Sequence, residues 1–138
     1  MPLRPLNASD LEAVNRLHRS VWWPQRSKAG WRWLMTNPAA AEIDAPHGWV
    51  IDHGAGAEAV VGNFIQRFWL NGRALHGATG YSIVVPPAHR GRSRALIDAF
   101  LDQLARRGYR VVRLVPRDNS IFGRDLITAG FAEQGAAS

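Results

Sequence analysis

The feature that most restricts the fold is the dipeptide Asn71-Gly72, which separates two long strand-like segments, Ala59–Leu70 and Arg73–Val85. Asparagine and glycine accept the positive φ angles of a two-residue type I′ turn, so we expect the two segments to form an antiparallel hairpin. A shorter strand-like segment, Trp49–Asp52, precedes them. The sequence therefore predicts a three-stranded antiparallel meander.

The residues after the hairpin predict a helix and then a parallel strand. Pro86 and Pro87 end the third strand, because proline has no N–H for the hydrogen-bond ladder. Apolar residues then recur at helical spacing as far as Gly108: Leu96, Ile97, Phe100, Leu101 and Leu104. The segment Arg110–Val115 is almost continuously apolar. Since a helix intervenes, we expect it to lie parallel to the strand that ends at Val85.

The N-terminal part predicts a short strand and helices. Leu3–Leu6 is the strand candidate, and Ser9 and Glu12 have the spacing of a helix capping box. An amphipathic helix follows, which we expect to stop at Pro24, and its apolar residues are Leu11, Val14, Leu17 and Val21. Four of the six tryptophans lie in residues 22–38. Their pattern favours packing, with a wall for a substrate as the alternative.

Composition is that of one soluble globular domain, expected to span residues 1–138. The chain is 46% hydrophobic and 20% charged, which excludes a mostly disordered protein, and no apolar run is long enough to cross a membrane. It has no cysteine, which excludes disulfides, a thiolate nucleophile and zinc–thiolate clusters. The first residues lack the apolar core of a secretory signal, so we expect a cytoplasmic protein.

Basic residues exceed acidic ones, which gives a formal net charge of +6, and all basic residues except Lys28 are arginine. Arginine suits bidentate recognition of phosphate and carboxylate. Scattered arginines nevertheless favour a solvated surface over a nucleic-acid interface. The densest group is Arg90, Arg92 and Arg94, directly before the predicted helix.

This basic loop has the chemistry of an anion site. The start of a helix offers backbone N–H groups without intrahelical partners and a partial positive charge. Gly91, Ser93 and Ala95 are small enough to let a ligand approach these groups, and the alternating arginines add charge around them. The spacing indicates a phosphate or pyrophosphate site, with a merely well-capped, soluble turn as the alternative.

The chain resembles the GNAT superfamily of N-acetyltransferases along nearly its whole length. The superfamily's acetyl-CoA loop has the form Gln/Arg-x-x-Gly-x-Gly/Ala after a strand ending near Val-x-Pro. Here Val85-Pro86-Pro87 precedes Arg90, Gly91 and Ala95, while Ser93 stands where the middle glycine is expected. Asn119 and Gly130-Phe131 resemble the later part of the pattern. The resemblance implies a mixed α/β fold with a central, mostly antiparallel sheet, helices on both faces and a splayed parallel strand pair at the cofactor site.

The resemblance also implies how acetyl-CoA would be bound and used. Its pantetheine would pair with the backbone of Val84 and Val85, and its pyrophosphate would rest on the amides of residues 90–95, with Asn119 also in the cofactor site. A neutral amine would attack the thioester in a ternary complex, and a backbone N–H near Val85 would stabilise the oxyanion. This implies neither a covalent enzyme intermediate nor a metal. The acceptor would be a small molecule or an amino group of a larger molecule.

The residues for proton transfer are less well defined. Many family members have a tyrosine where this chain has Leu126, so Ser120 or a water would have to protonate the leaving thiolate. His76 and Tyr81 are candidates for the base by residue type. A CoA-binding or protein-interaction module with impaired catalysis is therefore an alternative, and a nucleic-acid binder is a third. The short segment after Phe131 would leave a sheet edge open for a second copy, or mark a minimal form of the fold.

Overall fold

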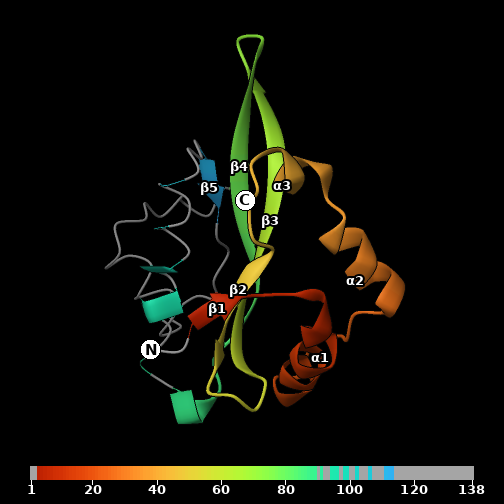
Figure 1. The fold of residues 1–138 in the computed structure, drawn as a ribbon, viewed down its shortest axis with the longest axis vertical. Coiled ribbons are helices and arrows are strands. Elements are labelled where there is room, and N and C mark those ends of the chain that lie inside the picture. Colours follow the sequence, from red (N-terminus) through yellow and green to blue (C-terminus); the bar gives the residue numbers. More distant parts are fainter. Residues whose placement is uncertain are drawn as a thin grey trace, which may run out of the picture.

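The computed structural model describes residues 3–89, 91, 94–96, 98, 99, 102, 106 and 111–113. In this part of the chain, five strands form one sheet and helices flank it (Figure 1). Residues 94–96, 98, 99, 102 and 106 are helical, which agrees with the helix predicted there. The remaining elements, in chain order, are β1 (Leu3–Pro5), η1 (Ala8–Asp10), α1 (Leu11–Ser20), α2 (Lys28–Met35), α3 (Pro38–Glu42), β2 (Gly48–Asp52), β3 (Ala57–Leu70), β4 (Arg73–Val84), η2 (Pro87–His89) and β5 (Val111–Arg113).

The sheet has the strand order β1-β2-β3-β4-β5. All neighbouring strands are antiparallel except β4 and β5, which are parallel. The predicted meander of β2, β3 and β4 is therefore confirmed, and so is the parallel strand that the intervening helix requires. The mixed α/β class implied by the resemblance is confirmed as well.

The β3–β4 hairpin is the longest feature of the molecule and projects beyond the rest of the described fold (Figure 1). Its turn residues, Asn71 and Gly72, have φ angles of 50° and 76°. Both values are positive, as a type I′ turn requires, which confirms the turn prediction. The pairing then continues without a break from Leu70–Arg73 to Gly62–Tyr81.

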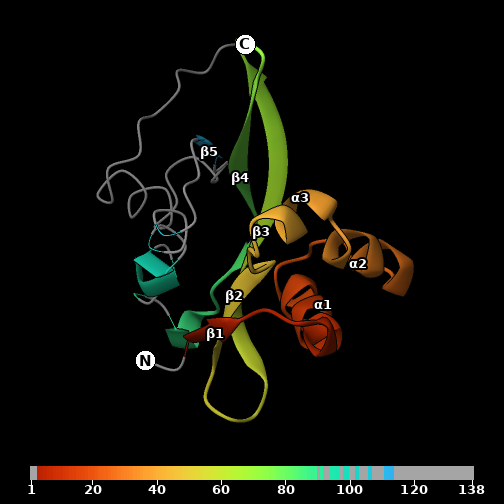
Figure 2. The same ribbon diagram turned by 45° about the horizontal axis from the view of Figure 1, so that its top comes forward.

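The sheet separates two hydrophobic clusters, because successive strand residues point to opposite faces. Val50 and Val60 belong to the cluster beneath α1 and α2, together with Trp31. Ile51 and Val61 belong to the cluster on the other face, where α3 and the helical residue Leu96 pack. Figure 2 shows helices on the two sides of the sheet. This confirms the expected helices on both faces.

The chain passes from one face to the other around the edge of β3. Strand β2 pairs with β3 only as far as Gly62, so the edge of β3 beyond this point lacks a strand partner among the described residues. The Asn37 side chain occupies part of that edge, because its Nδ2 donates to the Ile65 carbonyl at 2.7 Å. Its Oδ1 accepts from the Ala39 N–H at 3.1 Å and caps α3, whose first residue is Pro38. The sequence interpretation did not separate this helix from α2.

The N-terminal capping box lies two residues earlier than predicted. Asn7 Oδ1 accepts from the Ser9 N–H, and Asp10 Oδ2 accepts from the Asn7 N–H, so η1 carries the box and the Ser9–Glu12 prediction is wrong. Arg4 also binds the Asp10 carboxylate: its Nη1 donates to Oδ2 at 2.9 Å and its Nη2 donates to Oδ1 at 2.8 Å. These contacts hold the carboxylate in place beside Asn7. Burial alone would raise the pKa of Asp10, but these hydrogen bonds outweigh it and hold the pKa below its usual value.

Helix α1 ends at Ser20, before the predicted stop at Pro24. Trp22 takes a left-handed conformation with a φ of 62°, and the Trp23 N–H donates to the His18 carbonyl at 2.9 Å. This turn closes the helix without proline. None of the described helices is long and apolar enough to span a membrane. The sequence also predicts a last helix, capped by Asp118, Asn119 or Ser120 and ending at Gly130, which lies outside the described residues.

Candidate functional site

Strand β4 carries a bulge near its carboxyl end. Gly62 pairs with Tyr81 and Val60 pairs with Val84, so Val61 alone faces two residues, Ser82 and Ile83. Ser82 has a φ of 51°, a left-handed conformation that side chains other than glycine adopt at a cost. A bulge of this kind bends its strand and increases the local twist. The end of β4 is thus turned out of the regular sheet.

The bulge begins where the described pairing with β5 has ended. Residues 77–79 of β4 pair with residues 111–113 of β5, and within the described part of the chain β5 has no later pairing with β4. The two strands run in the same direction. The bulged end of β4 is the place where the sequence analysis put acetyl-CoA.

The end of β4 is held firmly although it is irregular. Val84 is buried in the cluster beneath α1 and α2, while Val85 packs against the cluster on the opposite face. Because the two side chains are anchored on different faces, the backbone between them is fixed at the sheet plane. Both residues were predicted to bind the cofactor through this backbone.

The loop after β4 reaches the described helical residues through Gly91. Its φ is 86°, and a Cβ built on it would meet no atom of the described residues within 4 Å. The glycine is therefore needed for its backbone angle rather than to make room for these residues. Leu96 is fully buried and anchors the following helix, and Ala95 is half-buried.

The arginines predicted for this loop are only partly described. Arg94 donates from Nε to Asp98 Oδ1 at 2.8 Å, one turn along the helix, and stays partly exposed. Arg90, Arg92 and Ser93 lie outside the described residues. Of the predicted phosphate loop, the structure therefore places Gly91, Arg94 and Ala95.

Tyr81 lies immediately before the bulge. A Cβ on Gly62 would come within 2.5 Å of its ring, so the ring lies across β3 where that glycine leaves space. The Arg26 guanidinium also lies over the Tyr81 ring, 5.2 Å from its centroid. Burial raises the pKa of Tyr81, and the positive charge of Arg26 opposes this in part. Tyr81 is thus a neutral phenol at neutral pH.

His76 lies elsewhere on β4. His76 and Tyr81 are an odd number of residues apart on a regular stretch of β4. Because successive strand residues point to opposite faces, the two side chains project from opposite faces of the sheet. His76 Nε2 is 2.8 Å from Glu42 Oε2, and Arg67 also contacts this carboxylate. Hydrogen bonds from Arg67 and then His76 hold the pKa of Glu42 below its usual value. The structure does not bring the two candidate bases together.

The remaining predicted site residues, Ser120 and Asn119, lie outside the described residues, and so does Leu126. Sequence reasoning missed two residues at the bulge, Arg26 and Gly62. Arg26 looked like one more surface arginine in a loop, and Gly62 like an ordinary small strand residue. A glycine directly opposite a tyrosine in a hairpin is the signal that could have identified their contact, once the register from Asn71-Gly72 had been counted back.

The tryptophans of the α1–α2 region divide into two groups. Trp31 is buried in the core, as the packing interpretation predicts. Trp22 and Trp33 are exposed, at 96% and 66%, and Trp33 stacks on Phe64 of β3 with centroids 5.8 Å apart. Trp33, Phe64 and Tyr81 therefore share the α1–α2 face of the hairpin. The possibility of an aromatic substrate wall applies to this exposed group.

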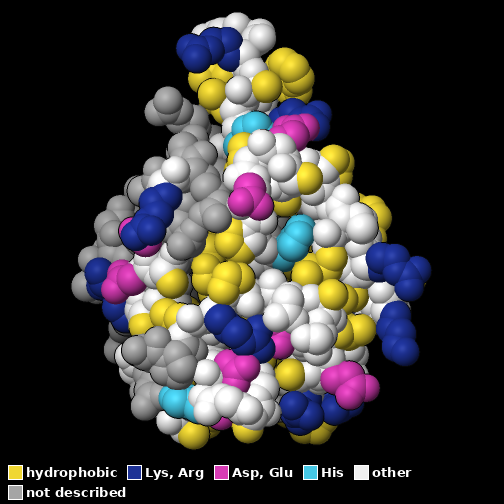
Figure 3. Space-filling view, in the orientation of Figure 1, with side chains coloured by type: hydrophobic (Ala, Val, Ile, Leu, Met, Phe, Trp, Pro, Cys, Tyr) yellow, Lys and Arg dark blue, Asp and Glu magenta, His cyan; other side chains and the backbone are white. Residues whose placement is uncertain are grey.

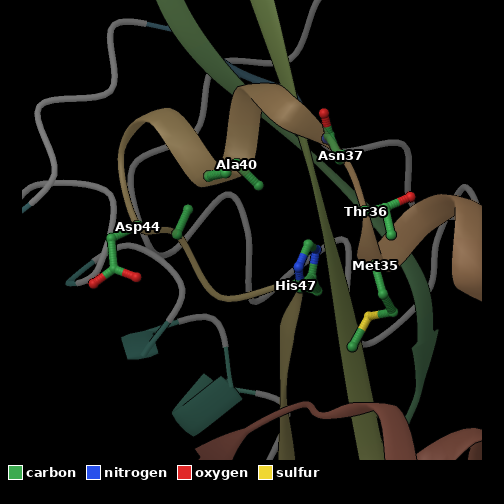
Figure 4. A pocket seen from close by; sticks show the side chains of 8 residues that line it. Met35, Thr36, Asn37, Ala40, Asp44 and His47 are labelled. Atoms are coloured by element: carbon green, nitrogen blue, oxygen red, sulfur yellow. The ribbon is translucent and has the colours of Figure 1, made fainter.

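A separate cavity of about 210 Å³ lies by the α2–α3 turn (Figure 4). Met35, Asp44 and His47 are among its lining residues, and burial lowers the pKa of His47. None of the bulge residues lines it. On the face seen in Figure 3, Lys and Arg side chains are dispersed among acidic ones and form no single basic surface.

A comparison with known protein families identifies the family to which this chain belongs. A model described as an acetyltransferase (GNAT) domain matches residues 2–125. The chain belongs to the GNAT acetyltransferase family. It is therefore an acyltransferase, as the sequence resemblance implied. No curated protein matches the sequence significantly.

Solved structures agree with this family. A putative acetyltransferase from Agrobacterium tumefaciens has a TM-score of 0.72 at 18% identity, over 100% of this chain and 97% of that chain. A predicted acetyltransferase from Clostridium acetobutylicum, solved with acetyl-CoA, has a TM-score of 0.71 at 13% identity, over 97% and 91%. For the ribosomal-protein-alanine N-acetyltransferase of Brucella melitensis biovar Abortus 2308 the values are 0.70 and 19%, over 100% and 96%. At these identities the likeness shows the GNAT fold.

Within the described residues of this GNAT chain, no group of three or more His, Asp or Glu side chains is placed to hold a metal ion. The described features at the end of β4 are features of the backbone: a bulge, and a left-handed glycine before a helix. The family match gives the acetyl-transfer class but does not identify the acceptor.

Proposed function

We propose that this GNAT enzyme transfers an acetyl group from acetyl-CoA to a primary amine by direct attack within a ternary complex. One observation carries the proposal. Strand β4 bulges at Ser82 and Ile83, beyond its described pairing with the parallel β5, and the chain then passes through the left-handed Gly91 to a helix. A bulged strand and a helix start both offer backbone hydrogen-bonding groups, which suit an extended chain joined to a diphosphate.

The described residues fit such a ligand. The backbone at Val84 and Val85 is held from both faces, so it can pair with the amides of pantetheine as an additional strand would. Gly91 has no side chain to obstruct a diphosphate that approaches the amides of residues 90–95. Arg94 lies at the same end of the helix and adds positive charge there. When bound, acetyl-CoA supplies the thioester carbonyl that the amine attacks.

The reaction forms a C–N bond and breaks the C–S bond, so the products are an amide and the CoA thiol. A backbone N–H near Val85 stabilises the negative charge on the carbonyl oxygen. One proton must leave the amine and one must reach the sulfur. Tyr81, His76 and Ser120 are the candidates for these transfers, and of the two described ones only Tyr81 adjoins the bulge.

Calorimetric titration of the protein with acetyl-CoA tests the first step. We expect saturable binding well below millimolar concentration, and a lack of binding at millimolar ligand would refute the cofactor assignment. Arg90→Ala and Ser93→Asp should weaken this binding without lowering the melting temperature. Unchanged affinity in both variants would contradict the role of the loop.

Turnover is measured as release of the CoA thiol with a thiol-reactive dye. The chain has no cysteine, so the dye reports CoA alone. Release that depends on an added amine supports catalysis. Binding of acetyl-CoA without amine-dependent release would favour the second candidate, a CoA-binding module with impaired catalysis. The contact that holds His76 to Glu42, on the face opposite Tyr81, is the observation that favours this second candidate.

A further inference from the structure

Arg26 is the most firmly positioned side chain of the connection between α1 and α2. Asn15 of α1 holds its backbone on both sides, since Asn15 Oδ1 accepts from the Arg26 N–H and Asn15 Nδ2 donates to the Arg26 carbonyl, both at 2.9 Å. Gly30 leaves room for the side chain, because a Cβ there would lie 3.4 Å from Arg26 Cγ. The folded backbone therefore fixes the direction in which the guanidinium extends.

The guanidinium lies on two aromatic rings, 5.2 Å from the centroid of Tyr81 and 6.0 Å from that of Trp31. Its Nη1 is buried without a hydrogen-bond partner. A buried donor without an acceptor is destabilising. The side chain as a whole is only half-buried, so an ion from solvent can reach it. The edge formed by Nε and Nη2 of a guanidinium can make a bidentate contact with a carboxylate or a phosphate.

Four described arginines, Arg4, Arg67, Arg94 and Arg106, have carboxylate partners. Arg16, Arg19, Arg32 and Arg73 have none among the described residues, but these side chains are exposed. Arg26 also pairs with no carboxylate in the part of the chain that the structure describes, although it is half-buried. A guanidinium that is held in place without its own counterion is complementary to an anion supplied from outside.

Arg26 is also close to the site of chemistry. It contacts Tyr81, and Tyr81 is the residue directly before the bulge at Ser82. An anion bound to Arg26 would therefore lie about one side chain from the bulged end of β4. The rings of Tyr81 and Trp31 form an apolar support beneath it, which strengthens an ion contact by excluding water.

We propose that Arg26 binds an anionic group of the acceptor, a carboxylate or a phosphate, so that the acceptor of this enzyme is an anionic amine. The inference rests on the proposed function, because the amine must reach a thioester beside the bulge. The anionic group and the amine are then recognised by different parts of the site. Arg26 sets specificity and is not itself a catalytic residue.

The experiment compares matched amines with the full chain and saturating acetyl-CoA, with thiol release as the readout. One arm uses free amino acids, including glycine, β-alanine and 4-aminobutyrate, against their carboxamides. The other arm uses O-phosphoethanolamine against ethanolamine. We expect kcat/KM for one anionic set to exceed that of its neutral partners by about tenfold or more, which corresponds to about 1.4 kcal/mol. The arm that responds identifies carboxylate or phosphate.

Arg26→Gln should abolish most of this preference, chiefly by raising KM for the anionic amine. Arg26→Lys should restore it only in part, since lysine lacks the planar fork. Arg32→Gln is the matched control, because Arg32 is an exposed arginine on the neighbouring helix, and it should keep the preference. The melting temperature and the acetyl-CoA affinity of each variant verify that the fold and the cofactor site are intact.

The outcomes separate the two proposals. Equal use of anionic and neutral amines, or a preference that survives Arg26→Gln, overturns the role of Arg26 while leaving acetyl transfer standing. Binding of acetyl-CoA without turnover of any anionic amine also overturns it. A lack of acetyl-CoA binding by the wild-type chain overturns the proposed function itself.

Discussion

The two halves of β4 differ although they belong to one strand. From Arg73 to Gly80 the strand pairs with β3 in an unbroken register, and it is tied to α3 through the contact of His76 with Glu42. From Tyr81 to Val84 it is bulged, with Ser82 in a left-handed conformation. The regular half is a fully paired frame. The irregular half holds the backbone groups and side chains that are proposed to bind acetyl-CoA and transfer protons.

The difference has a physical origin. A regular ladder satisfies each backbone group within the sheet, so it leaves none for a ligand. The bulge is conformationally strained, and in return some of these backbone groups are left without a partner in the sheet. The regular half of β4 keeps that strain from relaxing. Substitutions in the two halves should therefore affect stability and ligand binding differently.

The largest effect is expected for Gly62→Val. A Cβ at this position would lie 2.5 Å from the Tyr81 ring, over which the Arg26 guanidinium also lies, so the ring cannot move without cost. Overpacking of this kind lowers the free energy of unfolding by about 1–3 kcal/mol. Urea unfolding measures the loss. Ala74→Val, exposed in the regular half, is the control and should change stability by about 0.5 kcal/mol or less.

Ser82→Val should have the next largest effect. Valine at a φ of 51° clashes with its own backbone, which costs about 1–2 kcal/mol, and relief of that strain would close the bulge and weaken acetyl-CoA binding. Calorimetry and urea unfolding check the two consequences. Thr79→Val in the regular half removes one side-chain contact with Gln66 and should cost no more than about 1 kcal/mol. Equal acetyl-CoA affinity in the two variants would deny the bulge a part in binding.

Gly91→Ala and Gly72→Ala form a matched pair. Both glycines have positive φ angles, 86° and 76°, and neither Cβ would meet an atom of the described residues within 4 Å. Each variant should lose about 1 kcal/mol of stability, because alanine resists this conformation. Only Gly91→Ala should also weaken acetyl-CoA binding, by about tenfold if about 1.4 kcal/mol of contact is lost. The same affinity in both variants would mean that the backbone at Gly91 is unrelated to the ligand.

The smallest effect concerns pH and the frame. The folded state lowers the pKa of Glu42 from its usual 4.5, so the stabilisation by this carboxylate is present above that pH and is lost as pH falls through the lower, folded pKa. Wild type should therefore melt slightly above Glu42→Gln at pH 7, and the difference should vanish in acid. A difference that persists at pH 2 would argue against an electrostatic contribution.

Local chemistry accounts for the parts of the fold that the sequence predicted. The hairpin follows from Asn71-Gly72, and the parallel β5 follows from the helix between it and β4. The capping box was misplaced because Arg4 binds the Asp10 carboxylate and holds it where it accepts from the Asn7 N–H. That competition depends on tertiary contact and has no local signature.

The site was predictable in place but not in detail. The motif around Gly91 predicts where a diphosphate would bind, and this stays a prediction; the structure gives Gly91 a positive φ of 86°. The bulge has no sequence signal, because Ser82 is neither glycine nor asparagine. The contact of Arg26 with Tyr81 joins residues far apart in the chain, so only the folded register reveals it.

The side-chain amide of Asn37 has a consequence for how such molecules avoid one another. A projecting hairpin exposes a strand edge, and exposed edges recruit further strands and lead to aggregation. Because Asn37 occupies the Ile65 carbonyl, the edge of β3 is interrupted just where β2 stops. One amide thereby gives the sheet a boundary beside a long, projecting hairpin.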